Sequence, residues 1–278
     1  MEVIIAEYCG FCMGVNLAIH KAEETARETG KVLTDGPLIH NRQVVEKLRD
    51  SGIEEMPDGV LPEEGETVLL RAHGVPRQRR EELLARGVRI VDATCPHVKK
   101  AQAIIERYTG EGFTGIVIGD KNHAEIRSIL GHAKGPCHVV QNETETPTIN
   151  VKDAPFVVIC QTTFSIYEID EILALLPLEE GRDIVVKTVC RATQDRQEAA
   201  HRIAEIVDVV FVVGGRHSAN TNRLAKLCRS VNERTWHIET ADEITPDKVE
   251  GARTAGVTAG ASTPDWIIQK VCEKLESM

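Results

Sequence analysis

Residues 88–101 read Val88-Arg89-Ile90-Val91-Asp92-Ala93-Thr94-Cys95-Pro96-His97-Val98-Lys99-Lys100-Ala101. The first part, 88–93, is a short, mostly apolar run with β-branched residues, which is typical of a strand. The second part has apolar residues at helical spacing, and Pro96 falls in the first helical turn, where its missing N–H costs nothing. The stretch therefore predicts a strand that leads to Cys95 and a helix that begins at this cysteine.

The same arrangement recurs around Cys12 and Cys190, so the chain contains a threefold repeat. Between these cysteines, predicted strands and helices alternate in the same order in each repeat. The further strands are expected at 31–35, 53–56, 67–72, 115–119, 138–141, 156–160, 209–213, 236–239 and 255–259. Alternation of this kind indicates βαβ units and parallel sheets. We therefore predict an α/β fold of three pseudo-equivalent lobes with parallel four-stranded sheets, arranged as a trefoil around a central site.

The repeat also predicts the domain boundaries. Lobe 1 is expected to span residues 13–94, lobe 2 residues 95–189 and lobe 3 residues 190–278. The third repeat has only three strands of its own, whereas residues 1–12 hold an orphan strand. We expect this N-terminal strand to complete the sheet of lobe 3.

Composition excludes several classes of function. The chain has 278 residues, with 33 Lys and Arg against 43 Asp and Glu, and aromatic residues are few. This balance provides neither the basic surface nor the stacking platforms of a general nucleic-acid-binding protein. The N-terminus lacks the features of a signal peptide, and the longest apolar run, Val209–Val213, is too short to span a membrane. We expect a cytoplasmic protein that binds no membrane.

Three of the eight cysteines, Cys12, Cys95 and Cys190, occupy equivalent positions at helix starts. A helix N-terminus favours the thiolate, which is the form that binds metals. Three thiolates with no obvious fourth ligand suit an iron–sulfur cluster with one open iron, or a zinc site completed by water or His. We interpret four of the other cysteines as small core residues: Cys137, Cys160, Cys228 and Cys272. Cys9 is close to Cys12 in the sequence, and we expect it to have no role in the metal site.

Polar side chains gather in the loops that follow the predicted strands, where parallel sheets bind their ligands. They are His40, His73, His123, Thr162, Ser218, Asn220 and Ser262. Neutral or cationic donors beside helix N-termini favour an anion, in particular a phosphate group. Glu125 lies in the same loop as His123, and we interpret it as a general acid, although a carboxylate in the first turn of a helix is also common.

The motifs taken together resemble one family over essentially the whole chain, the 4-hydroxy-3-methylbut-2-enyl diphosphate reductases (IspH/LytB). The segments that carry the resemblance are Phe11-Cys12-Met13-Gly14-Val15, His40-Asn41-Arg42, Ala72-His73-Gly74-Val75, Asp92-Ala93-Thr94-Cys95-Pro96, His123-Ala124-Glu125, Gln161-Thr162-Thr163, Asn222-Arg223 and Val257-Thr258-Ala259-Gly260-Ala261-Ser262. This chain departs from the family in having Ala219 where a second serine is usual, and Ala124 where proline is usual.

The resemblance implies a trefoil around a 4Fe–4S cluster with three Cys ligands, Cys12, Cys95 and Cys190, and one open iron. It implies a two-electron reductive dehydration that gives isopentenyl and dimethylallyl diphosphates, the last step of the non-mevalonate isoprenoid pathway. Glu125 and Thr162 would then deliver protons. The diphosphate would be bound by His40, His73, His123, Ser218, Asn220 and Ser262, and the electron donor would be a ferredoxin or flavodoxin.

Three alternatives stay open at this point. Quinolinate synthase has a similar arrangement of lobes around a cluster, but its carboxylate substrates would favour more Arg or Lys in the loops. A zinc hydrolase with three Cys ligands would be colourless, whereas an iron–sulfur protein is brown. A redox sensor or electron carrier would not need a set of anion donors beside an open iron.

Overall fold

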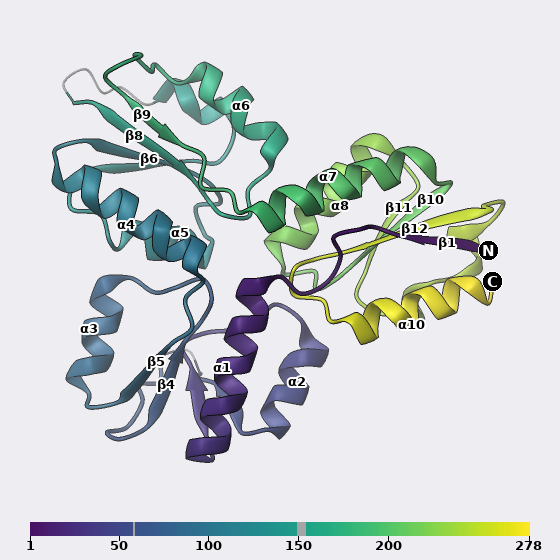
Figure 1. The fold of residues 1–278 in the computed structure, drawn as a ribbon, viewed down its shortest axis with the longest axis horizontal. Helices are drawn as coiled ribbons and strands as arrows, with labels where there is room; N and C mark the ends of the chain where they lie inside the picture. The colour runs from purple at the N-terminus through teal and green to yellow at the C-terminus, as the bar shows by residue number, and fades with distance from the viewer. Residues whose placement is uncertain (58, 149–153) are drawn as a thin grey trace. The chain divides into compact units, whose positions relative to one another are not determined.

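The computed structural model describes residues 1–57, 59–148 and 154–278, and these form three parallel four-stranded sheets with flanking helices (Figure 1). The chain divides into two compact units. The terminal unit comprises Met1–Asn16, Ile39–Leu48 and Arg191–Met278, and the central unit comprises Leu17–Leu38 and Arg49–Cys190.

The sheet of the terminal unit has the strand order β1-β12-β10-β11. Its strands are β1 (Glu2–Ile5), β12 (Thr254–Ala259), β10 (Val209–Val213) and β11 (Thr235–Ile238). β1 pairs in parallel with β12. The prediction that the N-terminal strand joins the sheet of the third repeat is thus confirmed.

Apolar side chains cover both faces of this sheet. On one face, Val210 and Val212 pack in a cluster with residues of α7 (Arg191–Ile206) and α8 (Ala219–Val231). On the other, Phe211 packs with α10 (Asp265–Glu276), which lies along the sheet in Figure 1. The pleat sends successive side chains to opposite faces, so the continuous apolar run of β10 fills both clusters. The remaining helices of this unit are short: α2 (Arg42–Asp50), whose last two residues belong to the central unit, α9 (Pro246–Val249) and the 3-10 turn Ala241–Glu243.

The central unit contains the other two sheets. The strands of the first, in order, are β3 (Ile53–Glu55), β2 (Val32–Thr34), β4 (Thr67–Leu70) and β5 (Arg89–Asp92). Those of the second are β7 (Cys137–Val140), β6 (Thr114–Ile118), β8 (Phe156–Cys160) and β9 (Ile184–Val186). Both orders match that of the terminal unit, because in each sheet the strand that leads to a repeat cysteine lies at one edge.

The helices of the central unit complete the α/β layers. α4 (Pro96–Gly110) and α5 (Ala124–Leu130) contribute to the cluster on one face of the second sheet, and α6 (Ile166–Leu175) contributes to the cluster on the other. α3 (Arg77–Ala85) packs Leu83 against the first sheet, and α1 (Met13–Thr29) begins in the terminal unit and continues here. A 3-10 segment spans Glu143–Thr148.

The predicted fold class is therefore confirmed as three parallel four-stranded α/β sheets in one repeated order. The three lobe boundaries stay a prediction. Within the described parts of the chain, no helix has the length and apolarity to cross a membrane.

Candidate functional site

Each repeat cysteine is fixed by its backbone to the polar loop of the neighbouring strand. The amide of each cysteine donates to a carbonyl just beyond the strand that pairs with the edge strand leading to that cysteine. The bonds run from Cys12 to Ala261 (3.2 Å), from Cys95 to Ala72 (3.0 Å) and from Cys190 to Thr162 (3.0 Å). The same bond therefore recurs in all three repeats and places each cysteine directly beside a proposed binding loop.

The three repeat cysteines also share a chemistry that fits a metal centre. All three are half-buried, and none forms a disulfide. Each directly precedes a helix, and the amide of Val15 donates to the Cys12 sulfur at 3.4 Å. A backbone donor at a helix N-terminus stabilises a thiolate. The donor set of the chain thus fits an iron–sulfur cluster, although no group of three His, Cys, Asp or Glu able to hold a metal is found among residues 1–57, 59–148 and 154–278.

The other cysteines are structural. Burial raises the pKa of Cys160 and of Cys228 to about 12, and burial also raises the pKa of Cys137 and Cys272 above the ordinary value. Burial raises the pKa of Cys9 to about 12, although the positive charge of Arg196 acts in the opposite direction. These groups remain thiols near neutral pH, as expected for core residues.

The central unit brings together Glu125, Thr162, His123 and His73. The Glu125 side chain is buried, and its two oxygens accept from Thr162: the amide at 2.6 Å and the hydroxyl at 2.9 Å. His123 begins α5, where its Nδ1 accepts from the Glu125 amide at 3.2 Å. The ring of His123 meets the ring of His73 edge-on, with centroids 5.2 Å apart.

The sequence left two interpretations open for Glu125, a general acid and a carboxylate in the first turn of a helix, and this geometry is compatible with both. The residue does lie in the first turn of α5, but its carboxyl group turns inward to Thr162 rather than to solvent. In the neutral imidazole of His123, Nδ1 is an acceptor, so the proton lies on Nε2 and can be donated to an anion.

Gln161 is a site residue that sequence reasoning missed. Its buried amide accepts from the Asp120 backbone at 2.9 Å and donates to the Thr163 hydroxyl at 3.1 Å. It thereby fixes the loop that holds His123 to the loop that holds Thr162. The sequence did contain a signal for this residue, because Gln161 is polar and directly follows an apolar predicted strand.

The terminal unit gathers Ser218, Asn220 and Ser262, all buried. Ser218 caps α8 by accepting from the Thr221 amide at 3.3 Å, which leaves its own proton free to be donated. Among the described residues, Asn220 Nδ2 and Ser262 Oγ are buried without a hydrogen-bond partner. Such groups are rare because burying them costs free energy, so Asn220 and Ser262 are candidates for contact with a ligand.

His40 also belongs to the terminal unit, although the sequence assigns it to lobe 1. Its carbonyl oxygen lies so close to Gly215 that a Cβ there would be only 2.1 Å away. A Cβ on Gly260 would lie 2.0 Å from the Thr221 hydroxyl oxygen, so a larger residue there would have to displace this buried side chain. The loop after β10 is thus packed against backbone, and the loop after β12 against the Thr221 side chain.

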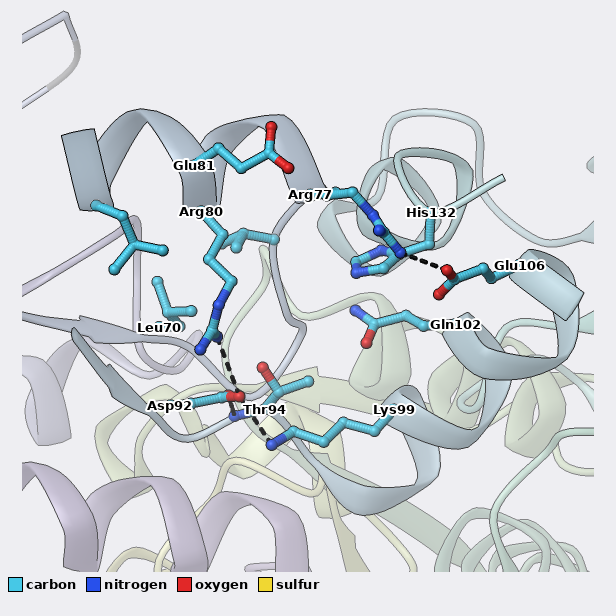
Figure 2. Close-up of a pocket in the computed structure, with 12 residues that line it drawn as sticks. Leu70, Arg77, Arg80, Glu81, Asp92, Thr94, Lys99, Gln102, Glu106 and His132 are labelled. Carbon is cyan, nitrogen blue, oxygen red and sulfur yellow. Dashed lines mark hydrogen bonds and ion pairs between the residues drawn. The ribbon is translucent and has the colours of Figure 1, made fainter. Parts of the chain in front are cut away.

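Figure 2 shows a cavity of about 510 Å³ in the central unit, near Cys95. Five of its charged residues form ion pairs: Arg77 with Glu106, and both Arg80 and Lys99 with Asp92. Burial acts to raise the pKa of Asp92, but hydrogen bonds from Lys99 and Thr94 outweigh it and hold the pKa below the ordinary range. The ion pairs that line this cavity therefore stabilise the end of β5, and we do not assign the cavity to the proposed anion site.

Comparison with known proteins identifies the family. The model of the family described as "LytB protein" matches residues 3–276. The 4-hydroxy-3-methylbut-2-enyl diphosphate reductase of Anaeromyxobacter sp. (strain Fw109-5) is 40% identical, and the alignment covers 100% of this chain and 98% of that protein. The reductase of the same name from Geobacter sulfurreducens is 41% identical, with 99% and 97% covered.

Solved structures of similar proteins give the same result. One, of (E)-4-hydroxy-3-methyl-but-2-enyl diphosphate reductase, "the Terminal Enzyme of the Non-Mevalonate Pathway", is 37% identical with a TM-score of 0.70, covering 100% of this chain and 99% of that one. Another, the E-1-hydroxy-2-methyl-but-2-enyl-4-diphosphate reductase from Plasmodium falciparum, is 26% identical with a TM-score of 0.93, covering 98% and 87%. With its motifs, its three sheets and these matches over its full length, the chain belongs to the LytB protein family.

Proposed function

We propose that this chain is a 4-hydroxy-3-methylbut-2-enyl diphosphate reductase. It would take up two electrons and two protons, break the allylic C–O bond and release water, giving isopentenyl diphosphate or dimethylallyl diphosphate. The relatives at about 40% identity carry this name. The observation that carries the proposal is the buried Glu125 carboxyl group hydrogen-bonded to both the amide and the hydroxyl of Thr162.

Cys12, Cys95 and Cys190 would hold a 4Fe–4S cluster with one open iron. When bound, such a cluster supplies electrons and a Lewis-acid site for an oxygen ligand. The assignment rests on three half-buried cysteines that form no disulfide, each at a helix start and each fixed by the same backbone bond. The division into lobes 13–94, 95–189 and 190–278 with 1–12 follows from the same repeat.

The diphosphate would be bound by donors from both units: His40, His73, His123, Ser218, Asn220 and Ser262. In the terminal unit, the unpaired donors of Asn220 and Ser262 would gain partners when the anion binds. In the central unit, Nε2 of His123 would donate while its Nδ1 accepts from the backbone. Hydrogen bonds from preorganised buried donors to a charged ligand are worth about 1.5–3 kcal/mol each.

Glu125 and Thr162 would deliver the proton that turns the hydroxyl group of the substrate into water. A protonated Glu125 can donate to the Thr162 oxygen, whose own proton then passes to the leaving oxygen. The 2.9 Å separation between the two side chains suits such a transfer. Burial of both groups keeps bulk water from competing for the proton.

An anaerobic assay of the reconstituted protein tests this function. We expect addition of the diphosphate substrate to cause rapid oxidation of reduced viologen, and Cys12→Ser, Cys95→Ser and Cys190→Ser each to abolish it. Cys160→Ser is the matched control, because Cys160 is buried in the core cluster of β6 and β8. Protein with an intact cluster that oxidises no viologen on substrate addition would contradict the proposal.

The electron donor would be a ferredoxin or flavodoxin, and the reaction would take place in the cytoplasm. The donor class follows from the family resemblance alone. Turnover with a purified donor of each class in place of viologen tests the first inference. If neither a ferredoxin nor a flavodoxin supports turnover, the inferred donor class is wrong.

A further inference from the structure

Arg196 is a buried cation that the mechanism above does not use. It lies in α7 and is only 4% exposed. α7 begins at Arg191, directly after Cys190. A charge is costly to bury, so a buried guanidinium must be compensated by good hydrogen bonds.

The guanidinium reaches a residue next to a proposed ligand. Its Nη2 donates to the carbonyl oxygen of Gly10 at 2.6 Å, across 186 positions of sequence, and its Nη1 donates to Ala192 in its own helix at 3.2 Å. Gly10 is two residues before Cys12. Charge-assisted bonds of this kind are about twice as strong as neutral ones. Arg196 therefore ties the loop of Cys12 to α7.

The loop at Gly10 is conformationally and sterically constrained. Gly10 has a φ of +87°, and a Cβ there would lie 2.9 Å from Asp265 Oδ1 and 3.3 Å from the Thr263 carbonyl. The loop is thus pressed toward the start of α10 on one side and bonded to α7 on the other. Two residues later, the Cys12 amide donates to Ala261.

We propose that Arg196 is a positioning residue for the metal centre, which holds the Cys9–Cys12 loop so that the Cys12 sulfur keeps its orientation. The inference rests on the proposed function, because it assumes that Cys12 is a cluster ligand. Residues that orient metal ligands typically change metal affinity by about 10- to 100-fold when they are replaced.

The test compares Arg196→Met and Arg196→Lys with wild-type protein after anaerobic reconstitution. The readouts are iron content, the electron paramagnetic resonance spectrum of the reduced cluster and the rate at which a chelator removes iron. We expect Arg196→Met to lose iron about 10- to 100-fold faster and to show an altered spectrum. Arg196→Lys should fall between, because its ammonium group can still donate one bond to Gly10.

Two control variants in α7 separate positioning from general destabilisation. Arg202 is exposed and lies 3.7 Å from Glu7, so Arg202→Met should behave as wild type. Ile203 is a core residue at 4% exposure, and Ile203→Ala should lower the unfolding temperature but leave the spectrum unchanged. If Arg196→Met does not fold, the spectrum and iron loss of Arg196→Lys decide the question.

The outcomes are distinct. An unchanged spectrum and unchanged iron loss in the Arg196 variants, with normal wild-type turnover, would overturn the role of Arg196 alone. The same loss of iron in Ile203→Ala at equal stability would also overturn it. A wild-type protein that holds no cluster would instead overturn the proposed function, and this inference with it.

Discussion

Two pairs of polar side chains, one pair in each unit, are in opposite states. In the central unit, Glu125 and Thr162 satisfy each other through two hydrogen bonds. In the terminal unit, Asn220 Nδ2 and Ser262 Oγ are buried without partners. Internally paired groups are preorganised and cost nothing to bury, whereas unpaired donors gain free energy only when a ligand arrives. Under the proposed function, the paired Glu125 and Thr162 would transfer a proton, whereas the unpaired donors of Asn220 and Ser262 would gain partners from the bound anion.

The largest effect is expected from Glu125→Gln. The amide keeps the size of the side chain but cannot supply a proton, so kcat should fall about 10²- to 10⁴-fold while KM stays nearly constant. Steady-state viologen oxidation measures both constants. Glu143→Gln, an exposed carboxylate in the central unit, is the matched control and should be neutral. Full activity of Glu125→Gln would exclude Glu125 as the proton donor.

Ser262→Ala should act on binding instead. Loss of one hydrogen bond to a charged ligand, about 1.5–3 kcal/mol, should raise KM by about 10- to 100-fold with little change in kcat. Because the hydroxyl is unpaired in the free protein, the unfolding temperature should stay equal or rise. The neighbouring Thr263 donates to Val213 at 3.0 Å, so Thr263→Val should lose about 1 kcal/mol of stability. A destabilised Ser262→Ala protein would show that this donor is paired after all.

Gly260→Ala tests the packing that supports the anion-binding loops. The added Cβ would meet the Thr221 hydroxyl, and overpacking of this kind costs about 1–3 kcal/mol. Urea unfolding measures the loss. Gly110→Ala is the control, since the Cβ there would meet only the flexible Lys134 side chain, and its stability should not fall. Equal stability of both variants would refute the tight contact.

The smallest effect is a pH-dependent one in the central unit. The lowered pKa of Asp92 means that its ion pairs stabilise the fold above the ordinary carboxyl pKa, about 4, and that this stability is lost as the pH falls further. Asp92→Asn should therefore cost about 1–2 kcal/mol at pH 7 and progressively less below pH 4. Unfolding in urea across this pH range measures it, with exposed Asp50→Asn as control. A constant difference at all pH values would contradict the ionic origin.

The sequence predicted the three parallel sheets because apolar runs and helix starts are local patterns that recur three times. The order of the strands within each sheet was not predicted, since it depends on pairing between distant segments. The structure also shows that Cys12, Cys95 and Cys190 directly precede helices, as the repeat predicted, while their role as ligands and the role of the polar loop residues stay predictions.

Other features depend on contacts that no local pattern reveals. The backbone approach of His40 to Gly215 joins segments far apart in the chain, which is why His40 lies in the terminal unit. Whether a buried hydroxyl is paired, as in Thr162, or unpaired, as in Ser262, is decided by atomic distances. Arg196 left a weak signal, a charge among the buried positions of an amphipathic helix, which helical periodicity alone does not interpret.

Direct measurement of substrate binding to Glu125→Gln and to Ser262→Ala separates the two units most clearly. Anaerobic calorimetry measures the Kd of the substrate for each reconstituted variant, and because no reductant is added, the substrate is not consumed. The division of labour predicts a wild-type Kd for Glu125→Gln and a Kd raised about 10- to 100-fold for Ser262→Ala. A weakened Glu125→Gln together with an unchanged Ser262→Ala would contradict it.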